Sequence, residues 1–429
     1  MKSEYLVKKL DNGIELVWAP LSGRRSVSVG VWVRVGGRDE SPALSGASHF
    51  LEHLVFKGTH RRTTYQIKEE VEGKGGSLNA FTGEEYTCFL AKTTAAHFDQ
   101  TFDVLADMVT GATLRPEDLE KERTVILEEI KMTQDQPSQL VDEILSEALW
   151  GGHALGRPIA GTVKTVGAMT REQITAFRDT YYRQPYLTVS AAGDIDLRKL
   201  ETAVLRAFAR PRAGVRAPKR ELFRRSTAPA RLRSLNKKTE QTHLCLGVPA
   251  LPKDHPDEVP LDLLSVVLGG NMSSRLFNEV REERGLAYDI GSSLRRYTET
   301  GAFIVAAGVD GRKAPEAVGV VLKELEKVTR TDIGEAELRR AKDFYLGQLD
   351  LGLENTMNLM LWAGENALSS RTNRTLAQLR SKVDRTTATD LRRIASRIFR
   401  TSALHLALVG PDARKLAAAI RPRLSFSGR

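Results

Sequence analysis

The chain has 429 residues, of which 41% are hydrophobic and 28% charged, so it is long and apolar enough for two or more globular domains. No apolar run approaches the roughly 20 residues of a membrane-spanning helix, and Met1 to Leu16 lacks the apolar core of an export signal. The two cysteines, Cys88 and Cys245, are too few for a disulfide framework, and we expect them to be buried thiols. Together, these three features predict a cytoplasmic protein without membrane attachment.

The first half of the chain is predicted to mix strands with long helices. Apolar runs and alternating patterns predict three strands, at residues 26–35, 86–91 and 187–192. A shared apolar face predicts a helix that contains Phe98, Phe102, Leu105 and Val109. A second helix is predicted from Pro116, where Pro-Glu-Asp is typical of a helix start, to about Thr133.

The most specific chemical pattern is His49-Phe-Leu-Glu52-His53, which lies in an otherwise apolar segment and predicts a buried helix. Histidines four residues apart share one face of a helix, as two ligands of one metal ion must. Glu52 lies beside them and can act on a metal-bound water without binding the metal. The order H-x-x-E-H is that of the inverzincins. The alternative is a pair of core histidines that are satisfied by hydrogen bonds.

A catalytic zinc site needs a third protein ligand and an open position for water. The helix that begins at Pro116 offers Glu122 and Glu129, which are seven residues apart and therefore lie on one stripe. Carboxylates in a largely apolar stripe are costly to bury unless they bind a metal or pair with a cation. Helical periodicity alone does not choose between Glu128 and Glu129, and either one could lie on a solvated face.

The net charge of +10 is concentrated in one stretch of the chain. Residues 206–238 hold 12 of the 64 Lys and Arg residues but only one of the 54 acids, so the remainder is nearly neutral. The composition predicts a basic linker at residues 211–238 between domains at residues 1–210 and 239–429. A segment that docks a polyanion is the alternative. Because no aromatic residues alternate with the basic ones, we expect no nucleic-acid partner.

The second half repeats the pattern of the first. Further strands are predicted at residues 243–248, 302–307 and 404–409. At a constant offset of 217 positions, the segment from Val166 aligns with that from Val383, and Gly193 aligns with Gly410. Both segments predict a Thr-capped amphipathic helix followed by a strand. We therefore predict a duplicated chain of two homologous α+β domains, with chance similarity as the alternative.

These patterns together resemble the pitrilysin family of zinc metallopeptidases, in its mitochondrial-processing-peptidase-like branch of two-domain chains. In that family a glutamate follows the second histidine of H-x-x-E-H at a characteristic long spacing, and Glu129 stands at the matching distance from His53 along this chain. The segments at 56–59 and 75–82 are also similar to the family's, and the resemblance spans nearly the whole chain. It implies the family's half-clamshell of two α+β domains.

The resemblance also implies roles for individual residues. Each chain would bind one zinc ion through His49, His53 and Glu129. Glu52 would accept a proton from the zinc-bound water, and Glu122 falls on the family's second acidic position beside the metal. Asn79 and Ala80 fall on the strand edge that pairs with the substrate backbone in such enzymes, which is a form of β-strand addition.

The second half carries a different motif. Residues 275–288 are similar to the family's C-terminal Arg and Tyr motif, which implies that Arg281 and Tyr288 bind substrate and stabilise the tetrahedral intermediate. At the offset that relates the two halves, Val266 and Gly270 take the places of the two histidines, so we expect no second metal site. In the family, two half-clamshells close around a peptide, and the Arg and Tyr that face one zinc come from the opposite half. Because this chain carries both the zinc-site residues and the Arg and Tyr pair, we predict a homodimer.

We therefore predict a zinc-dependent endopeptidase that hydrolyses peptide bonds in unstructured peptides. Recognition through a strand edge reads the backbone more than the side chains, which favours extended substrates of varied sequence. One rival is a non-catalytic core subunit of the same family, although such subunits lose zinc ligands or the base and this chain retains all four. The other rival is a protein that binds nucleic acid through the basic stretch.

Overall fold

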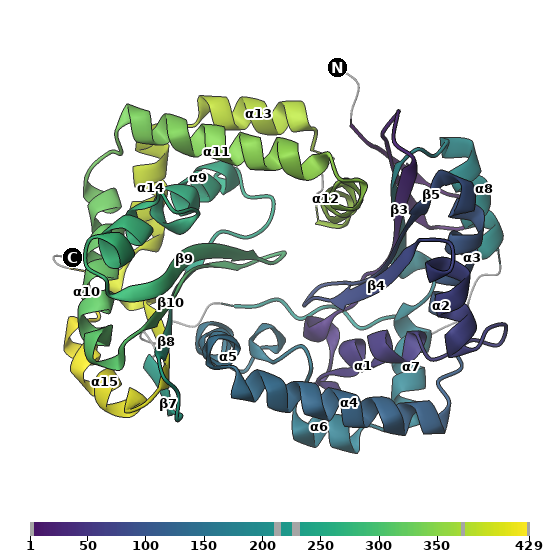
Figure 1. The fold of residues 1–429 in the computed structure, drawn as a ribbon, viewed down its shortest axis with the longest axis horizontal. Coiled ribbons are helices and arrows are strands. Elements are labelled where there is room, and N and C mark those ends of the chain that lie inside the picture. Colours follow the sequence, from purple (N-terminus) through teal and green to yellow (C-terminus); the bar gives the residue numbers. More distant parts are fainter. Residues whose placement is uncertain (1–3, 210–215, 225–231, 370–373, 427–429) are drawn as a thin grey trace. The chain divides into compact units, whose positions relative to one another are not determined.

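The computed structural model describes residues 4–209, 216–224, 232–369 and 374–426. Contacts divide the chain into two compact units, and each unit is assembled from three segments. Unit 1 consists of Met1–Ile130, Arg157–Glu221 and Asp350–Leu376. Unit 2 consists of Lys131–Gly156, Leu222–Leu349 and Ala377–Arg429. Each unit packs helices on one mixed sheet (Figure 1), which confirms the expected α+β class.

Unit 1 contains a six-stranded sheet in the order β1-β2-β6-β3-β5-β4. Its strands are β1 (Leu6–Lys9), β2 (Glu15–Pro20), β3 (Ser26–Val33), β4 (Ser77–Thr82), β5 (Thr87–Thr94) and β6 (Leu187–Gly193). Adjacent strands are antiparallel, except β2 and β6, which are parallel. The three strands predicted for the first half are β3, β5 and β6, while β4 forms one edge of the sheet.

An apolar core covers each face of this sheet, as the side chains of β3 show. Val27, Val29, Val31 and Val33 alternate along β3 and join the larger core, which also contains residues of α1, α3 and α7. Trp32 points to the opposite face, where it packs with α12. The helices that lie wholly or mostly in unit 1 are α1 (Ala47–Val55), α2 (Thr64–Glu72), α3 (Phe98–Gly111), α4 (Pro116–Asp135), α6 (Val163–Ala168), α7 (Arg171–Tyr181), α8 (Leu197–Ala207) and α12 (Thr356–Ser369).

Unit 2 contains a five-stranded sheet in the order β7-β11-β8-β10-β9. Its strands are β7 (Leu232–Asn236), β8 (Thr242–Ala250), β9 (Ala287–Arg296), β10 (Gly301–Val309) and β11 (His405–Gly410). Strands β2 to β6 and strands β7 to β11 take the same places in their sheets, and among the described strands only β1 has no counterpart. The parallel pair is also equivalent, β2 with β6 and β7 with β11. The shared topology confirms the duplication.

The helices repeat as well. Those of unit 2 are α5 (Pro137–Trp150), α9 (Glu258–Gly269), α10 (Ala314–Arg330), α11 (Glu335–Leu353), α13 (Leu376–Arg385), α14 (Ala388–Ile398) and α15 (Ala413–Ile420). Thr170 and Thr387, which align at the offset between the two halves, are the N-caps of α7 and α14, and each forms a capping box. The predicted Thr-capped helix of each half is therefore present in both.

The two halves exchange one helix. Helix α5 belongs to the first half of the sequence but packs on β8 and β11 of unit 2. Helix α12 belongs to the second half but packs on β2, β3 and β6 of unit 1. Each exchanged helix covers the sheet face opposite the main helical layer, where Leu145 of α5 and Met360 of α12 lie in small apolar cores. Nothing in the sequence pattern predicted this exchange.

Part of the basic stretch lies within the described residues. Its residues 232–236 form the edge strand β7, and Arg220 forms a bidentate ion pair with Asp39 in unit 1. Residues 211–215 and 225–231 of the predicted linker lie outside the described residues. Within the described part of the chain, no helix is both long and apolar enough to cross a membrane.

Candidate metal centre

Helix α1 begins at a sharp turn that a buried carboxylate stabilises. Gly46 precedes the helix with φ of 98°, a left-handed conformation that glycine adopts without strain. The Glu40 carboxylate accepts hydrogen bonds from the Gly46 and Ser48 N–H groups, both at 2.7 Å. Phe50 and Leu54 face the core, so the remaining face of the helix carries His49, Glu52 and His53.

Helix α4 brings a third potential ligand to the two histidines. Glu129 Oε2 lies 3.7 Å from His49 Nε2 and 3.6 Å from His53 Nε2. One donor atom from each of the three residues lies within 4.8 Å of the others. Two ligand atoms on a tetrahedral zinc, each at about 2.0 Å, are roughly 3.3 Å apart, so this spacing fits one ion. Among the residues that the structure describes, no other cluster of His, Cys, Asp or Glu has this spacing.

The ion pair between Glu122 and Lys57 contacts His53 on the side of its ring away from Glu129. His53 Nδ1 lies 3.1 Å from Glu122 Oε2, and Lys57 Nζ lies 2.7 Å from Glu122 Oε1. The Glu122 side chain is only 8% exposed. If His53 carries its proton on Nδ1 and donates it to Glu122, the lone pair of Nε2 points toward Glu129 and can bind a metal ion. This Nδ1-protonated tautomer is the one that a metal bound through Nε2 requires. His49 Nδ1, in contrast, is buried and has no hydrogen-bond partner among the described residues.

The local electrostatics suit a cation at this position. Burial, and then the charge of His53, lower the pKa of His49 to about 4, so this imidazole is neutral at physiological pH. Burial raises the pKa of Glu52, and Glu129 adds to that effect. A hydrogen bond from Thr82 and the positive charge of His53 act in the opposite direction on the pKa of Glu52. A positive ion between these groups would favour the neutral imidazoles and the ionised carboxylates.

Strand β4 passes along α1 and supplies a contact to Glu52. The Thr82 hydroxyl donates a hydrogen bond to Glu52 Oε2 at 2.5 Å. Asn79 and Ala80 lie on the same strand, which is the last strand of the sheet among the described residues and so has a free edge. The Ala80 N–H donates to Asn79 Oδ1 at 2.8 Å. The structure therefore places the predicted substrate strand directly beside the predicted base.

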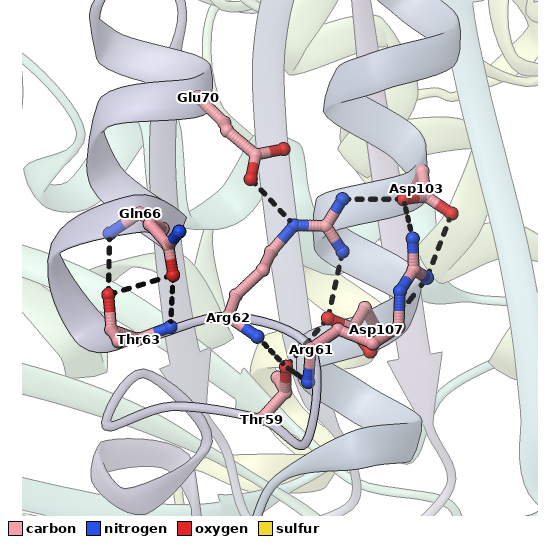
Figure 2. Close-up of polar contacts among 8 residues, drawn as sticks. All are labelled: Thr59, Arg61, Arg62, Thr63, Gln66, Glu70, Asp103 and Asp107. Atoms are coloured by element: carbon pink, nitrogen blue, oxygen red, sulfur yellow. Dashed lines mark hydrogen bonds and ion pairs between the residues drawn. The ribbon is translucent and has the colours of Figure 1, made fainter.

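The loop that follows α1 is held by a network of charges (Figure 2). Arg62 bonds to Glu70 of α2 and to Asp103 and Asp107 of α3, with N···O distances between 2.6 and 3.0 Å. Thr59 donates to the same Asp107 carboxylate, and its hydroxyl also accepts the Arg61 and Arg62 N–H groups. The side chains of Arg62 and Asp107 are only 9% and 7% exposed. The network therefore anchors residues 59–62, which follow Lys57 in the same loop.

Arg281 and Tyr288 belong to unit 2, and the structure brings them together. Arg281 lies in the π-helix η6 (Phe277–Glu282), and Tyr288 lies near the start of the edge strand β9. The Arg281 guanidinium stands 5.3 Å from the centre of the Tyr288 ring and 4.6 Å from that of Phe277. Tyr288 is 75% exposed, so the pair forms an accessible cation–π surface.

The equivalent region of unit 2 carries other residue types at the positions of the two histidines. Val266 of α9 and Gly270, its C-cap, align with His49 and His53 at the offset between the two halves. A cavity of about 290 Å³ remains between α9 and α11, and its lining includes Val266, Ser274 and Arg340. Because none of the described residues that line the cavity is a histidine or cysteine, it offers a transition metal no imidazole or thiolate donor.

Three residues near the centre were not predicted from the sequence: Glu40, Lys57 and Thr82. Lys57 and Thr82 lie within segments that resemble the family, but nothing in their spacing indicates which side chains they contact. Glu40 precedes α1 by a loop and has no periodic relation to the helix. Only the folded chain shows these contacts, because each partner lies on a different element or loop.

The comparisons with known proteins agree with this architecture. The family model for the insulinase family (Peptidase family M16) matches residues 19–163. The model described as the Peptidase M16 inactive domain matches residues 168–345. An uncharacterized zinc protease of Streptomyces coelicolor is 37% identical over 410 residues, which cover 94% of this chain and 88% of the relative. An uncharacterized zinc protease of Bacillus subtilis, YmxG, is 35% identical over 94% of this chain and 97% of its own length.

The duplicated α+β fold and the H-x-x-E-H helix place the chain among the pitrilysin-like proteins. More particularly, it belongs to peptidase family M16. Solved structures show the same fold. A protease from Helicobacter pylori superposes with a TM-score of 0.89 at 23% identity, over 96% of this chain and all of the other. An M16-like peptidase from Alicyclobacillus acidocaldarius gives a TM-score of 0.84 at 20% identity, over 96% of this chain and 99% of the other.

Proposed function

We propose that this protein is a zinc-dependent endopeptidase that holds one zinc ion per chain through His49, His53 and Glu129. The observation that carries the proposal is the convergence of three donor atoms from α1 and α4 at a spacing that fits one tetrahedral ion. The relatives that are named zinc proteases support the identity of the metal. Two imidazoles and one carboxylate also form a donor set that is typical of catalytic zinc.

Glu52 is the proposed general base. When zinc is bound, it lowers the pKa of its water and polarises the carbonyl group of the substrate. Glu52 then accepts the proton of the attacking water, and it returns this proton to the leaving amine as the peptide bond breaks. The carboxylate is suited to both steps because it adjoins His53 in sequence but is not one of the three clustered donors. Burial, which raises its pKa, strengthens it as a proton acceptor.

The proposed substrate is an extended peptide or an unfolded protein segment that pairs with β4. The free edge of β4 supports this proposal, as does the Ala80 N–H, which bonds to the side chain of its neighbour Asn79. An incoming peptide carbonyl could replace that side-chain oxygen and extend the sheet by one strand. A segment inside a folded domain would first have to break the hydrogen bonds that already pair its backbone groups.

We also propose that two copies of the chain form a homodimer, in which Arg281 and Tyr288 of one chain serve the zinc site of the other. The resemblance to two-part relatives supports this arrangement, and so does the presence of both residue sets in one chain. Arg281 and Tyr288 would donate hydrogen bonds to the oxyanion that develops during attack.

The proposed function is tested by separating metal binding from proton transfer. His49→Ala and His53→Ala should each release zinc, because two ligands do not retain the ion. Glu52→Gln should keep zinc and the fold but abolish peptide cleavage, because an amide does not accept the proton. Metal analysis by mass spectrometry and turnover of a fluorogenic peptide measure the two properties. Near-normal turnover by Glu52→Gln would refute the mechanism, and a zinc-loaded wild-type protein without activity would favour a non-catalytic core subunit.

A further inference from the structure

The hydrogen bond between Thr82 and Glu52 joins two elements with different proposed tasks. Glu52 lies on α1, and Thr82 is the last residue of β4. Thr82 is paired in the sheet with Thr87 of β5, so the ladder fixes its backbone. An ionised carboxylate can only accept a hydrogen bond, and therefore the Thr82 hydroxyl is the donor.

This bond is the only hydrogen bond that the Glu52 carboxylate makes to the described residues. A glutamate side chain has several rotatable bonds and loses considerable entropy when one orientation is imposed. The bond to Thr82 occupies Oε2 and leaves Oε1 free to accept a proton. A displacement of about 1 Å in a reacting group can cost roughly 100-fold in rate, so the orientation of this carboxylate matters.

We propose that Thr82 is a positioning residue that holds Glu52 in its proton-accepting orientation and couples that orientation to strand β4. The inference rests on the proposed function, in which β4 receives the substrate and Glu52 acts as the base. Asn79 and Ala80 precede Thr82 on the same strand. A peptide that pairs with this edge would restrain the strand and, through Thr82, the base. Substrate binding and the alignment of the base would thus be linked by one hydroxyl group.

Substitutions that remove only the hydroxyl test this role. Thr82→Val keeps the branched shape but removes the donor, whereas Thr82→Ser keeps the donor. We expect Thr82→Val to lower kcat by roughly 10- to 100-fold, with KM and zinc content nearly unchanged, and Thr82→Ser to restore most of the loss. The matched control is Thr87→Val on the facing strand, whose hydroxyl bonds to the Val35 carbonyl and not to Glu52. It should lower the Tm without a comparable loss of kcat.

A second measurement does not depend on catalysis. In metal-free protein, the Tm changes of Thr82→Val and Glu52→Ala should not add in the double variant, because either substitution alone already breaks the bond. Additive Tm changes, or a wild-type kcat in Thr82→Val, would overturn the role of Thr82. A loss of kcat that Thr82→Ser does not restore, or that follows a loss of zinc, would overturn it as well. A zinc-loaded wild-type protein that cleaves no peptide would instead overturn the proposed function.

Discussion

At the scale of single residues, Glu122 is a buried charge in contact with His53, one of the three proposed metal ligands. Its two oxygens contact His53 Nδ1 and Lys57 Nζ, so the carboxylate is paired on both sides. Residues that hold a ligating histidine in place typically change metal affinity by about 10- to 100-fold when they are removed. We predict a loss of this size in zinc affinity for Glu122→Gln, because a neutral amide orients His53 less strongly.

Competition with a chromogenic chelator measures this affinity. Glu120→Gln is the matched control, because it removes the same charge from the same helix at a side chain that is 66% exposed and pairs with Arg123 instead of a histidine. If Glu122→Gln bound zinc as tightly as Glu120→Gln, the carboxylate would have no part in orienting His53.

At the scale of elements, one buried acid at the start of helix α1 makes protein stability depend on pH. Burial raises the pKa of Glu40 to about 7, although the N–H groups of Ser48 and Gly46 act against this. In the unfolded chain the same carboxyl group ionises near its ordinary pKa of 4.5. The contribution of the Glu40 carboxyl group to the free energy of unfolding is therefore fully present below pH 4.5 and is lost as the pH rises through about 7.

Thermal unfolding of wild-type and Glu40→Gln protein between about pH 5 and pH 8.5 tests this prediction. Because glutamine does not titrate, the Tm of the wild type should fall relative to that of Glu40→Gln as the pH increases. A Tm difference that stays constant across this range would show that Glu40 does not titrate there.

The exchanged helix α12 depends on a close approach to the sheet. A Cβ atom at Gly364 would stand 2.7 Å from the Trp32 indole, whose Nε1 donates to Ser190 Oγ. Gly364→Ala should therefore destabilise unit 1 by about 1–3 kcal/mol through overpacking. The control is Gly347→Ala in α11, where a Cβ would meet no atom within 4 Å. There, alanine should stabilise the helix by roughly 0.5–1 kcal/mol. Urea denaturation measures both changes, and equal effects would contradict the close packing of α12.

At the scale of the whole molecule, the proposed homodimer predicts complementation between two defective chains. Glu52→Gln removes the base, and Tyr288→Phe removes the hydroxyl that would serve the opposite site. If Tyr288 acts in trans, a mixed dimer gathers both defects in one site and leaves the other intact. An equal mixture that exchanges subunits freely should then recover about one quarter of the wild-type rate.

Size-exclusion chromatography with light scattering establishes whether the chain dimerises, and differently tagged chains show whether subunits exchange. A mixture of the two variants that exchanges subunits but stays inactive would exclude action in trans. An active monomer would exclude the dimer as a requirement for catalysis.

The sequence by itself determined the features that depend on local spacing. Histidines four residues apart must share a face of α1, and the matching positions of Thr170 and Thr387 mark equivalent helices in the two halves. Alternation of apolar residues was sufficient to locate strands such as β3. These features could be predicted because helix and strand periodicity relate neighbours along the chain.

Only the tertiary structure decided which distant groups meet. Helical periodicity left Glu128 and Glu129 open and only the family resemblance pointed to Glu129, whereas the packing of α4 beside α1 shows Glu129 against the histidines. The fold also brings the Thr82 hydroxyl on β4 to Glu52 on α1. It likewise packs α5 of the first half on the sheet of unit 2, and α12 of the second half on the sheet of unit 1. An amphipathic helix of either half can cover an apolar sheet face, and no residue spacing specifies which sheet it covers. That choice depends on the shape of each apolar face, such as the fit of Gly364 against Trp32, and this shape exists only after the chain has folded.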